Sequence, residues 1–109
     1  MKTVLIDGTE YVERQKTGSI ILVRTYSAGV HFGTFVSRDG KEVVLNNARR
    51  LWSWQGACSL SQVAVDGVDL ASSKISCTVP EITLTEAIEL IPMSPNAGKS
   101  MMEVAPWKK

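Results

Sequence analysis

The chain has 109 residues, of which 44% are hydrophobic and 21% charged, a composition typical of one small globular domain and not of a disordered segment. Twelve basic and eleven acidic side chains leave a net charge of +1, which excludes a protein that coats a polyanion by bulk charge alone. No apolar run reaches the roughly 18 residues of a membrane span or forms a signal-peptide core. We therefore expect a single cytoplasmic domain over residues 1–109, without a membrane partner.

The first half of the chain predicts an antiparallel β-meander. Residues 19–26 are rich in β-branched and aromatic side chains, as strands are, and residues 27–29 predict a turn. Residues 30–37 continue as a second strand, in which Gly33 indicates a bulge or a sharp bend. The dipeptide Asp39-Gly40 is a hairpin signal, and residues 41–45 form the returning strand.

A further strand follows a second tight connection. Residues 46–48 predict that connection, because asparagine tolerates left-handed backbone. Residues 49–54 then form the strand. Its alternation places Arg50, Trp52 and Trp54 on one face and the intervening side chains on the other.

The second half predicts two short helices and one more strand. Residues 58–65 form a helix with Ser59 or Ser61 as its N-cap, and it ends at Asp66-Gly67. Residues 68–76 are polar and indicate a loop. Residues 81–91 alternate apolar and polar side chains, broken only by Glu86, which favours a single strand.

The C-terminal part carries weak helical spacing over residues 96–104, interrupted by Gly98. The tail after Pro106 is expected to fold Trp107 onto the body of the domain. The chain is thus mainly β, of the α+β class, with one or two short helices.

The meander resembles the Sm-like, SH3-type small barrel over residues 18–91. The likeness rests on a strand ending at Arg24, a bent strand with Gly33, the hairpin at Asp39-Gly40 and a final strand after an insertion. It implies a small closed β-barrel. Sm-like proteins form rings and bind RNA, so the resemblance also implies ring assembly and nucleic-acid binding.

Several stretches are similar to a family of small phage and prophage proteins that carries a domain-of-unknown-function label. They are VRTYSAGV (23–30), GKEVVL (40–45), NARRLW (47–52), SLSQ (59–62), LTEAIE (84–89) and PWK (106–108). The resemblance implies a phage accessory protein in the cytoplasm of a bacterial host. It implies no catalytic residue.

The charges are distributed unevenly along the chain. Residues 14–50 are predominantly basic (Arg14, Lys16, Arg24, Arg38, Lys41, Arg49 and Arg50 against Asp39 and Glu42). Residues 51–107 are predominantly acidic (Asp66, Asp69, Glu81, Glu86, Glu89 and Glu103 against Lys74 and Lys99). Three interpretations of this distribution stay open. The charges of the two halves pair with one another and keep the protein soluble, or the basic meander binds an anion, or the basic face of one copy binds the acidic face of another in a homo-oligomer.

One dense cluster carries the groups of a nucleotide pocket. Asparagine reads base edges, arginine binds phosphate through a planar fork, and tryptophan stacks on bases. The candidate ligand-binding residues are Arg24, Asn47, Arg49, Arg50, Trp52 and Trp54. The alternative is that these residues have structural roles only. The asparagines would then form a turn, Arg49 or Arg50 would pair with an acidic side chain, and Trp52 would lie in the core.

No enzyme chemistry stands out. The single histidine, His31, has no neighbouring carboxylate in sequence, and the chain lacks phosphate loops and zinc-hydrolase motifs. The alternative is an enzyme in which His31 pairs with Cys58 and activates its thiol as a nucleophile. We expect Cys58 and Cys77 to be free and mostly buried, because their spacing to His31 does not support zinc. We therefore predict a protein without enzymatic activity, metal or cofactor.

The leading functional hypothesis is an oligomeric phage protein that binds a nucleotide-type anion and sequesters a host defence signal. The second is a protein-interaction module that inhibits a host protein through Trp52, Trp54 and Trp107. The third is an RNA- or DNA-binding protein of Sm type.

Overall fold

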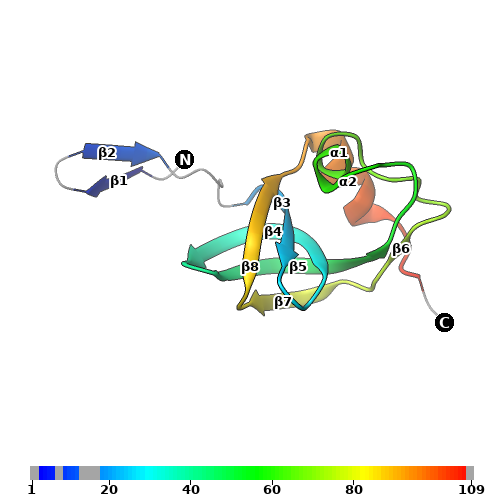
Figure 1. Cartoon of the computed structure of the whole chain (residues 1–109), viewed down its shortest axis with the longest axis horizontal. Helices are drawn as coiled ribbons and strands as arrows, with labels where there is room; N and C mark the ends of the chain where they lie inside the picture. Colours follow the sequence, from blue (N-terminus) through cyan, green and yellow to red (C-terminus); the bar gives the residue numbers. More distant parts are fainter. Residues whose placement is uncertain (1–2, 7–8, 13–17, 108–109) are drawn as a thin grey trace.

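The computed structural model describes residues 3–6, 9–12 and 18–107. Strands β1 (Thr3–Ile6) and β2 (Thr9–Val12) pair antiparallel as a hairpin. A second antiparallel sheet has six strands: β3 (Ile20–Thr25), β4 (Val30–Asp39), β5 (Glu42–Ser53), β6 (Lys74–Ile75), β7 (Val79–Leu84) and β8 (Ala87–Pro92). Two helices, α1 (Leu60–Asp66) and α2 (Pro95–Glu103), lie side by side next to this sheet (Figure 1).

The mainly β class with two short helices is confirmed. The meander β3–β4–β5 forms the centre of the sheet, β8 pairs with β3, and β7 and β6 both pair with β5. Within the described part of the chain, β7 and β8 do not pair with one another. The sheet is therefore open, where the resemblance to small barrels implied closure.

Two hydrophobic clusters cover the two faces of the sheet. On one face, Ile21 and Val23 of β3 pack with Leu45 of β5 and Leu84 of β7, so the curved sheet fills this face with its own side chains. On the other face, Leu22 and its neighbours pack against the helices (Phe32, Leu51, Val63, Ala64, Ile75 and Met101). The alternation of β3 explains why three consecutive side chains, residues 21–23, are all fully buried.

The bend expected at Gly33 is confirmed. The register of β4 against β5 shifts between Phe32 and Thr34, opposite residues 47 and 48. A Cβ atom at position 33 would lie 3.0 Å from both the Cα atom of Ala48 and the carbonyl oxygen of Asn46. Glycine is favoured because a side chain at this position would force the opposing backbone to shift by a few tenths of an ångström.

The turn expected at residues 46–48 is wrong. Asn47 does adopt the left-handed backbone that was expected, with φ 50°. It forms a bulge inside one continuous strand, β5, because Asn46 and Ala48 pair with Glu81 and Val79 of β7 on its other side. The left-handed residue bends the strand and does not reverse it.

The single strand expected at residues 81–91 is also wrong. It is two strands, β7 and β8, joined at Thr85 and Glu86, where the alternation was broken. Ile88 is consequently exposed, although the expected pattern placed it with the buried side chains. The expectation that residues 68–76 form only a loop is also wrong, because residues 74 and 75 form the short strand β6.

The first helix begins at one of the two expected caps, and the second begins at Pro95, one residue before the expected start at residue 96. The hydroxyl of Ser59 accepts a hydrogen bond from the backbone N–H of Gln62, so Ser59 is the N-cap of α1. Gly67, with φ 79°, ends that helix. Ser94 caps α2 in the same way, and Pro95 occupies its first turn, where a missing N–H costs nothing.

Candidate ligand-binding site

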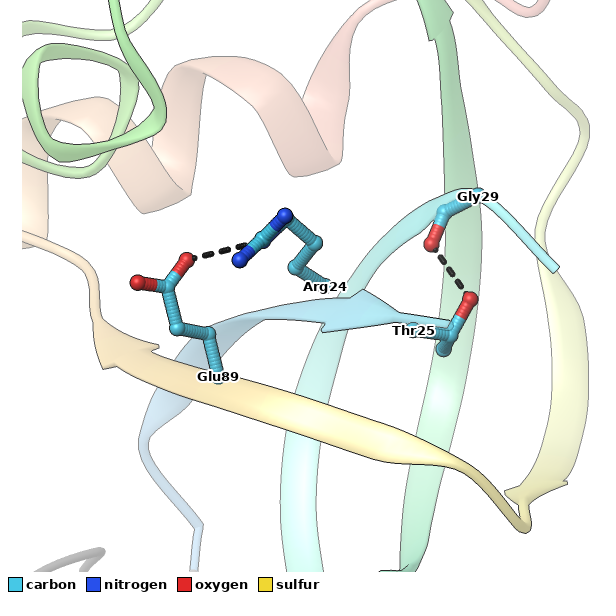
Figure 2. Close-up of polar contacts among 4 residues, drawn as sticks. All are labelled: Arg24, Thr25, Gly29 and Glu89. Carbon is cyan, nitrogen blue, oxygen red and sulfur yellow. Dashed lines mark hydrogen bonds and ion pairs between the residues drawn. The ribbon is translucent and has the colours of Figure 1, made fainter. Parts of the chain in front are cut away.

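Arg24 lies on β3 and is engaged by β8. Its Nε atom donates to the Oε1 atom of Glu89 at 3.1 Å, and both side chains are about half exposed (Figure 2). Close by, the hydroxyl of Thr25 donates to the carbonyl of Gly29 at 2.7 Å and closes the β3–β4 turn. Arg24 therefore has a carboxylate partner, and its role is to tie two neighbouring strands together.

Arg49 is buried, with 2% of its surface exposed, and points toward α2. Its Nε atom donates to the carbonyl of Ser76 at 2.9 Å. Its Nη1 atom donates to the carbonyls of Met101, Met102 and Val104 at 3.0, 3.0 and 2.7 Å. Burial lowers the pKa of the guanidinium. The charge of Arg49 lies at the C-terminal, negative end of the α2 dipole. These guanidinium N–H groups are therefore used in hydrogen bonds within the protein and are not available to a ligand.

Arg50 faces the opposite side of β5 and is exposed. Its backbone is fixed by Ser76, whose hydroxyl accepts from the Arg50 N–H at 2.8 Å and whose own N–H donates to the Arg50 carbonyl at 3.0 Å. Among residues 18–107, the guanidinium itself has no carboxylate or other hydrogen-bond partner. Two adjacent arginines thus have opposite environments.

Arg50 lies where two cavities meet. The first, of about 240 Å³, is lined by polar residues of β4, β5 and the segment after β6 and by apolar residues of β5 and β7 (His31, Ala48, Arg49, Arg50, Ser76, Cys77, Val79 and Ile82). Arg49 thus borders this cavity although its guanidinium donors are used by carbonyls of Ser76 and the α2 end. The second, of about 170 Å³, extends from His31 and Arg50 toward Glu86 and is lined by threonines (Thr25, Thr83 and Thr85). Because both cavities are lined by His31, Arg50 and Ile82, they are adjacent, and together they are named here the Arg50 groove.

His31 forms the inner wall of the Arg50 groove and is only 2% exposed. Its Nε2 atom donates to the carbonyl of Ala28 at 2.9 Å, since a carbonyl only accepts. Nδ1 has no partner among the described residues and is not sealed from solvent, so it faces the groove as an acceptor. Burial is the main cause that lowers the pKa of His31, and the nearby charge of Arg50 lowers it further.

An aromatic surface adjoins the groove along β5. Trp52 is 62% exposed, and its ring centroid lies 4.8 Å from that of Trp107 in an edge-to-face arrangement. The ammonium of Lys74 lies 5.6 Å from the Trp52 ring and 4.8 Å from the Trp107 ring. The expected docking of Trp107 on the body of the domain is confirmed, because the backbone N–H of Trp107 donates to the carbonyl of Ile75 at 2.8 Å.

The six candidate residues do not form one site. Arg50 and Trp52 lie on one surface, whereas Arg49 faces the helices and Arg24 pairs with β8. Trp54 is partly buried against the helix-side core, and Asn47 is exposed at the bulge. Arg14 and Lys16, which contributed to the basic half of the chain, lie outside the described residues.

Sequence reasoning missed Lys74 and Ser76, and it considered His31 only for metal binding and catalysis. Lys74 and Ser76 belong to a segment that was expected to be a loop, so nothing placed them next to β5. The one available signal was Ile75, the single apolar residue within residues 72–76.

The two cysteines differ from expectation in their burial. Cys58 and Cys77 are free thiols, and both are exposed. They lie in the loops before α1 and after β6, where side chains face solvent more often than in strands. In the part of the chain that the structure describes, no three histidine, cysteine or acidic side chains are grouped to hold a metal ion.

Fold and site together define a small, mainly β domain with a solvent-accessible groove around Arg50, whose guanidinium has no carboxylate partner among residues 18–107. A family model described as "Domain of unknown function (DUF6948)" matches residues 18–101, and the chain belongs to that family. No curated protein and no solved structure matches the chain. Of the helices in the described residues, neither is long and apolar enough to cross a membrane.

Proposed function

We propose that the protein is a non-enzymatic binding protein whose Arg50 groove takes the phosphate of a nucleotide-type anionic ligand. The observation that carries the proposal is the guanidinium of Arg50, which lies at the junction of two cavities without a carboxylate partner among residues 18–107. A guanidinium in this position binds phosphate through two parallel hydrogen bonds.

The chemistry of the groove favours one end for the phosphate. Glu86 lines the second cavity, and its Oε1 atom accepts from the hydroxyl of Ser27 at 2.9 Å, so that end carries negative charge. None of the described residues that line the first cavity is acidic, so the guanidinium of Arg50 faces no opposing charge there. The hydroxyl of Ser76 beside it is engaged, because it accepts from the Arg50 N–H and donates to the carbonyl of Cys77. We therefore assign the phosphate to the first cavity.

The size of the groove suits a small ligand. Each cavity is smaller than the roughly 300 Å³ at which small-molecule sites usually begin, but the two adjoin at His31 and Arg50, so one small ligand can occupy both. The hydroxyls of Thr83 and Thr85 and the Nδ1 atom of His31 supply further polar groups. They suit the hydroxyls of a sugar attached to the phosphate.

The biological setting that we propose is a phage accessory protein in the cytoplasm of a bacterial host, which sequesters a nucleotide signal of host defence. We also propose that the chain forms a homo-oligomer. The outer edges of β7 and β8 support it, because neither pairs with a further strand among the described residues, and an open strand edge is a template for pairing with another chain. Val79 and Ile88 are exposed on these strands. Light scattering that gives a monomer at micromolar concentration, in low and high salt alike, contradicts the oligomer.

Calorimetry with a panel of mononucleotides and cyclic dinucleotides tests the ligand class. We expect Arg50→Ala to weaken binding by about ten- to a hundredfold, the effect of losing charge-assisted hydrogen bonds. Arg38→Ala is the matched control, because Arg38 is equally exposed on β4 but does not line the groove. The proposal fails if the wild type gives no heat with any member of the panel.

A second candidate function is a module that binds and inhibits a host protein. The exposed indoles of Trp52 and Trp107 favour it, since tryptophan is enriched in the energetic centres of interfaces. A host protein that co-purifies with the wild type and is lost with Trp52→Ala, but retained with Arg50→Ala, indicates this function. A heterogeneous nucleic acid that co-purifies indicates the Sm-type RNA- or DNA-binding alternative.

A further inference from the structure

The exposed indoles lie next to residues of the Arg50 groove along β5 and β6. On β5, Arg50 and Trp52 are two residues apart, about 7 Å along the strand, and both are exposed, with the β5–β6 register shifting between Leu51 and Ser53. On β6, Lys74 lies beside Trp52, and Ser76 follows beside Arg50. A ligand that leaves the groove along β5 therefore meets the indoles directly.

The indoles are held in place and remain accessible. Leu51 pairs with Ile75, and the carbonyl of Ile75 accepts the N–H of Trp107, so the C-terminal segment is fixed to the edge of the sheet. The edge-to-face contact between Trp52 and Trp107 covers part of each ring. Even so, Trp52 is 62% and Trp107 38% exposed. We name Trp52, Trp107 and Lys74 the indole platform.

The platform combines two kinds of group that bind a nucleotide outside its phosphate. An exposed indole stacks on any base, because every base has a π-face. The Lys74 ammonium, held within 6 Å of both rings, keeps a positive charge beside the place where the base lies and attracts a second phosphate. Arg50 supplies the cation at the other end of the surface.

We propose that the indole platform is the base-binding subsite for the ligand whose phosphate binds Arg50. The inference rests on the proposed function and narrows it: the ligand class is a nucleotide with an accessible base, and an inorganic or sugar phosphate occupies the groove alone. The ribose spans the two-residue step between Arg50 and Trp52. Trp107 makes the C-terminal segment part of the site, although it lies far from β5 in sequence.

The experiment compares two probes, adenosine 5′-monophosphate and inorganic pyrophosphate, on the full chain by calorimetry. Trp52→Ala removes the stacking surface and should weaken the nucleotide about five- to 150-fold, while pyrophosphate binding stays unchanged. Trp54→Phe is the matched control, because Trp54 packs against the helix-side core. Trp107→Ala repeats the test at a position outside the sheet, should Trp52→Ala fail to fold.

The outcomes separate this inference from the proposed function. Equal nucleotide affinity in the wild type and both platform variants overturns the base subsite, while loss of both probes in Arg50→Ala still supports the groove. Equal loss of nucleotide and pyrophosphate in Trp52→Ala also overturns the subsite, since stacking acts only on the base. If neither probe binds the wild type, the groove and the subsite fall together.

Discussion

The Nη1 atom of Arg49 donates to the carbonyl oxygen of Val104 at 2.7 Å, which ties the middle of β5 to the residue that ends α2. The same nitrogen also reaches the last carbonyls of the helix, at Met101 and Met102. These carbonyls have no partner within the helix, so a buried guanidinium satisfies them in place of water. One side chain therefore fixes the second helix on the sheet.

Replacing Arg49 with alanine should destabilise the protein strongly. The variant leaves buried carbonyls without a donor and opens a cavity, so we expect the free energy of unfolding to fall by about 3 kcal/mol. Urea unfolding followed by circular dichroism measures the change.

Arg50→Ala is the control for this prediction. Arg50 is exposed and makes no side-chain hydrogen bond to a described residue, so its loss should change the free energy of unfolding by less than about 0.5 kcal/mol. Equal destabilisation by the two substitutions contradicts the assignment of Arg49 to the fold and Arg50 to the groove.

Much of the fold follows from local sequence. Strand alternation placed the arginines on opposite faces of β5, and the glycine at position 33 and the cap at Ser59 were read correctly. What failed was the interpretation of Asn47, because a left-handed residue produces either a turn or a bulge. The pairing of β5 with β7, which is 35 residues away at Asn46 and Glu81, decides between them.

The site was only partly predictable for the same reason. Arg50 and Trp52 were identified because both lie on one strand. Lys74 and Ser76 come to β5 through β6, a two-residue strand whose short span gives no periodic signal. The hydrogen bonds that hold the Arg49 guanidinium in the fold are accepted at the C-terminal end of α2, some 52 residues further along the chain. Such contacts are tertiary and leave no trace in local pattern.

Gly33→Ala should destabilise the sheet at the bulge. The added methyl group would lie 3.0 Å from backbone atoms of Asn46 and Ala48, which cannot move away as a flexible side chain does. We expect the free energy of unfolding to fall by about 1–3 kcal/mol, as for other overpacked positions. Thermal unfolding followed by circular dichroism measures it.

Asn47→Gly, on the opposing strand, is the matched control. Glycine adopts the φ of 50° without strain, so the bulge is preserved and the melting temperature should change little. A melting temperature for Gly33→Ala equal to that of the wild type shows that the two strands are not in close contact there.

Thiol reactivity gives an independent test of where the ligand binds. Both cysteines are exposed, so a thiol reagent should label two groups per native chain, and a metal assay should find no stoichiometric zinc. Cys77 lines the first cavity beside Arg50, whereas Cys58 lies before α1, outside the groove. A bound nucleotide should therefore slow labelling of Cys77 several-fold and leave Cys58 unchanged. Mass spectrometry of the labelled peptides distinguishes the two, and equal protection or no protection contradicts the assignment of the phosphate to this cavity.

The stability of the protein should fall between neutral and mildly acidic pH because of His31. Burial and the Arg50 charge lower its pKa in the folded state below the ordinary value of 6.5. Below pH 6.5 the unfolded chain therefore binds a proton that the folded chain does not, and each step toward lower pH favours unfolding until the folded pKa is reached. Melting temperatures at pH 7.5, 6.5 and 5.5 should decline for the wild type and less for His31→Gln, whose amide still donates to Ala28.

Arg50→Gln, which removes the Arg50 charge and leaves burial as the cause that lowers the His31 pKa, should give an intermediate decline. Identical pH profiles for the wild type and His31→Gln would show that the imidazole does not titrate differently on folding.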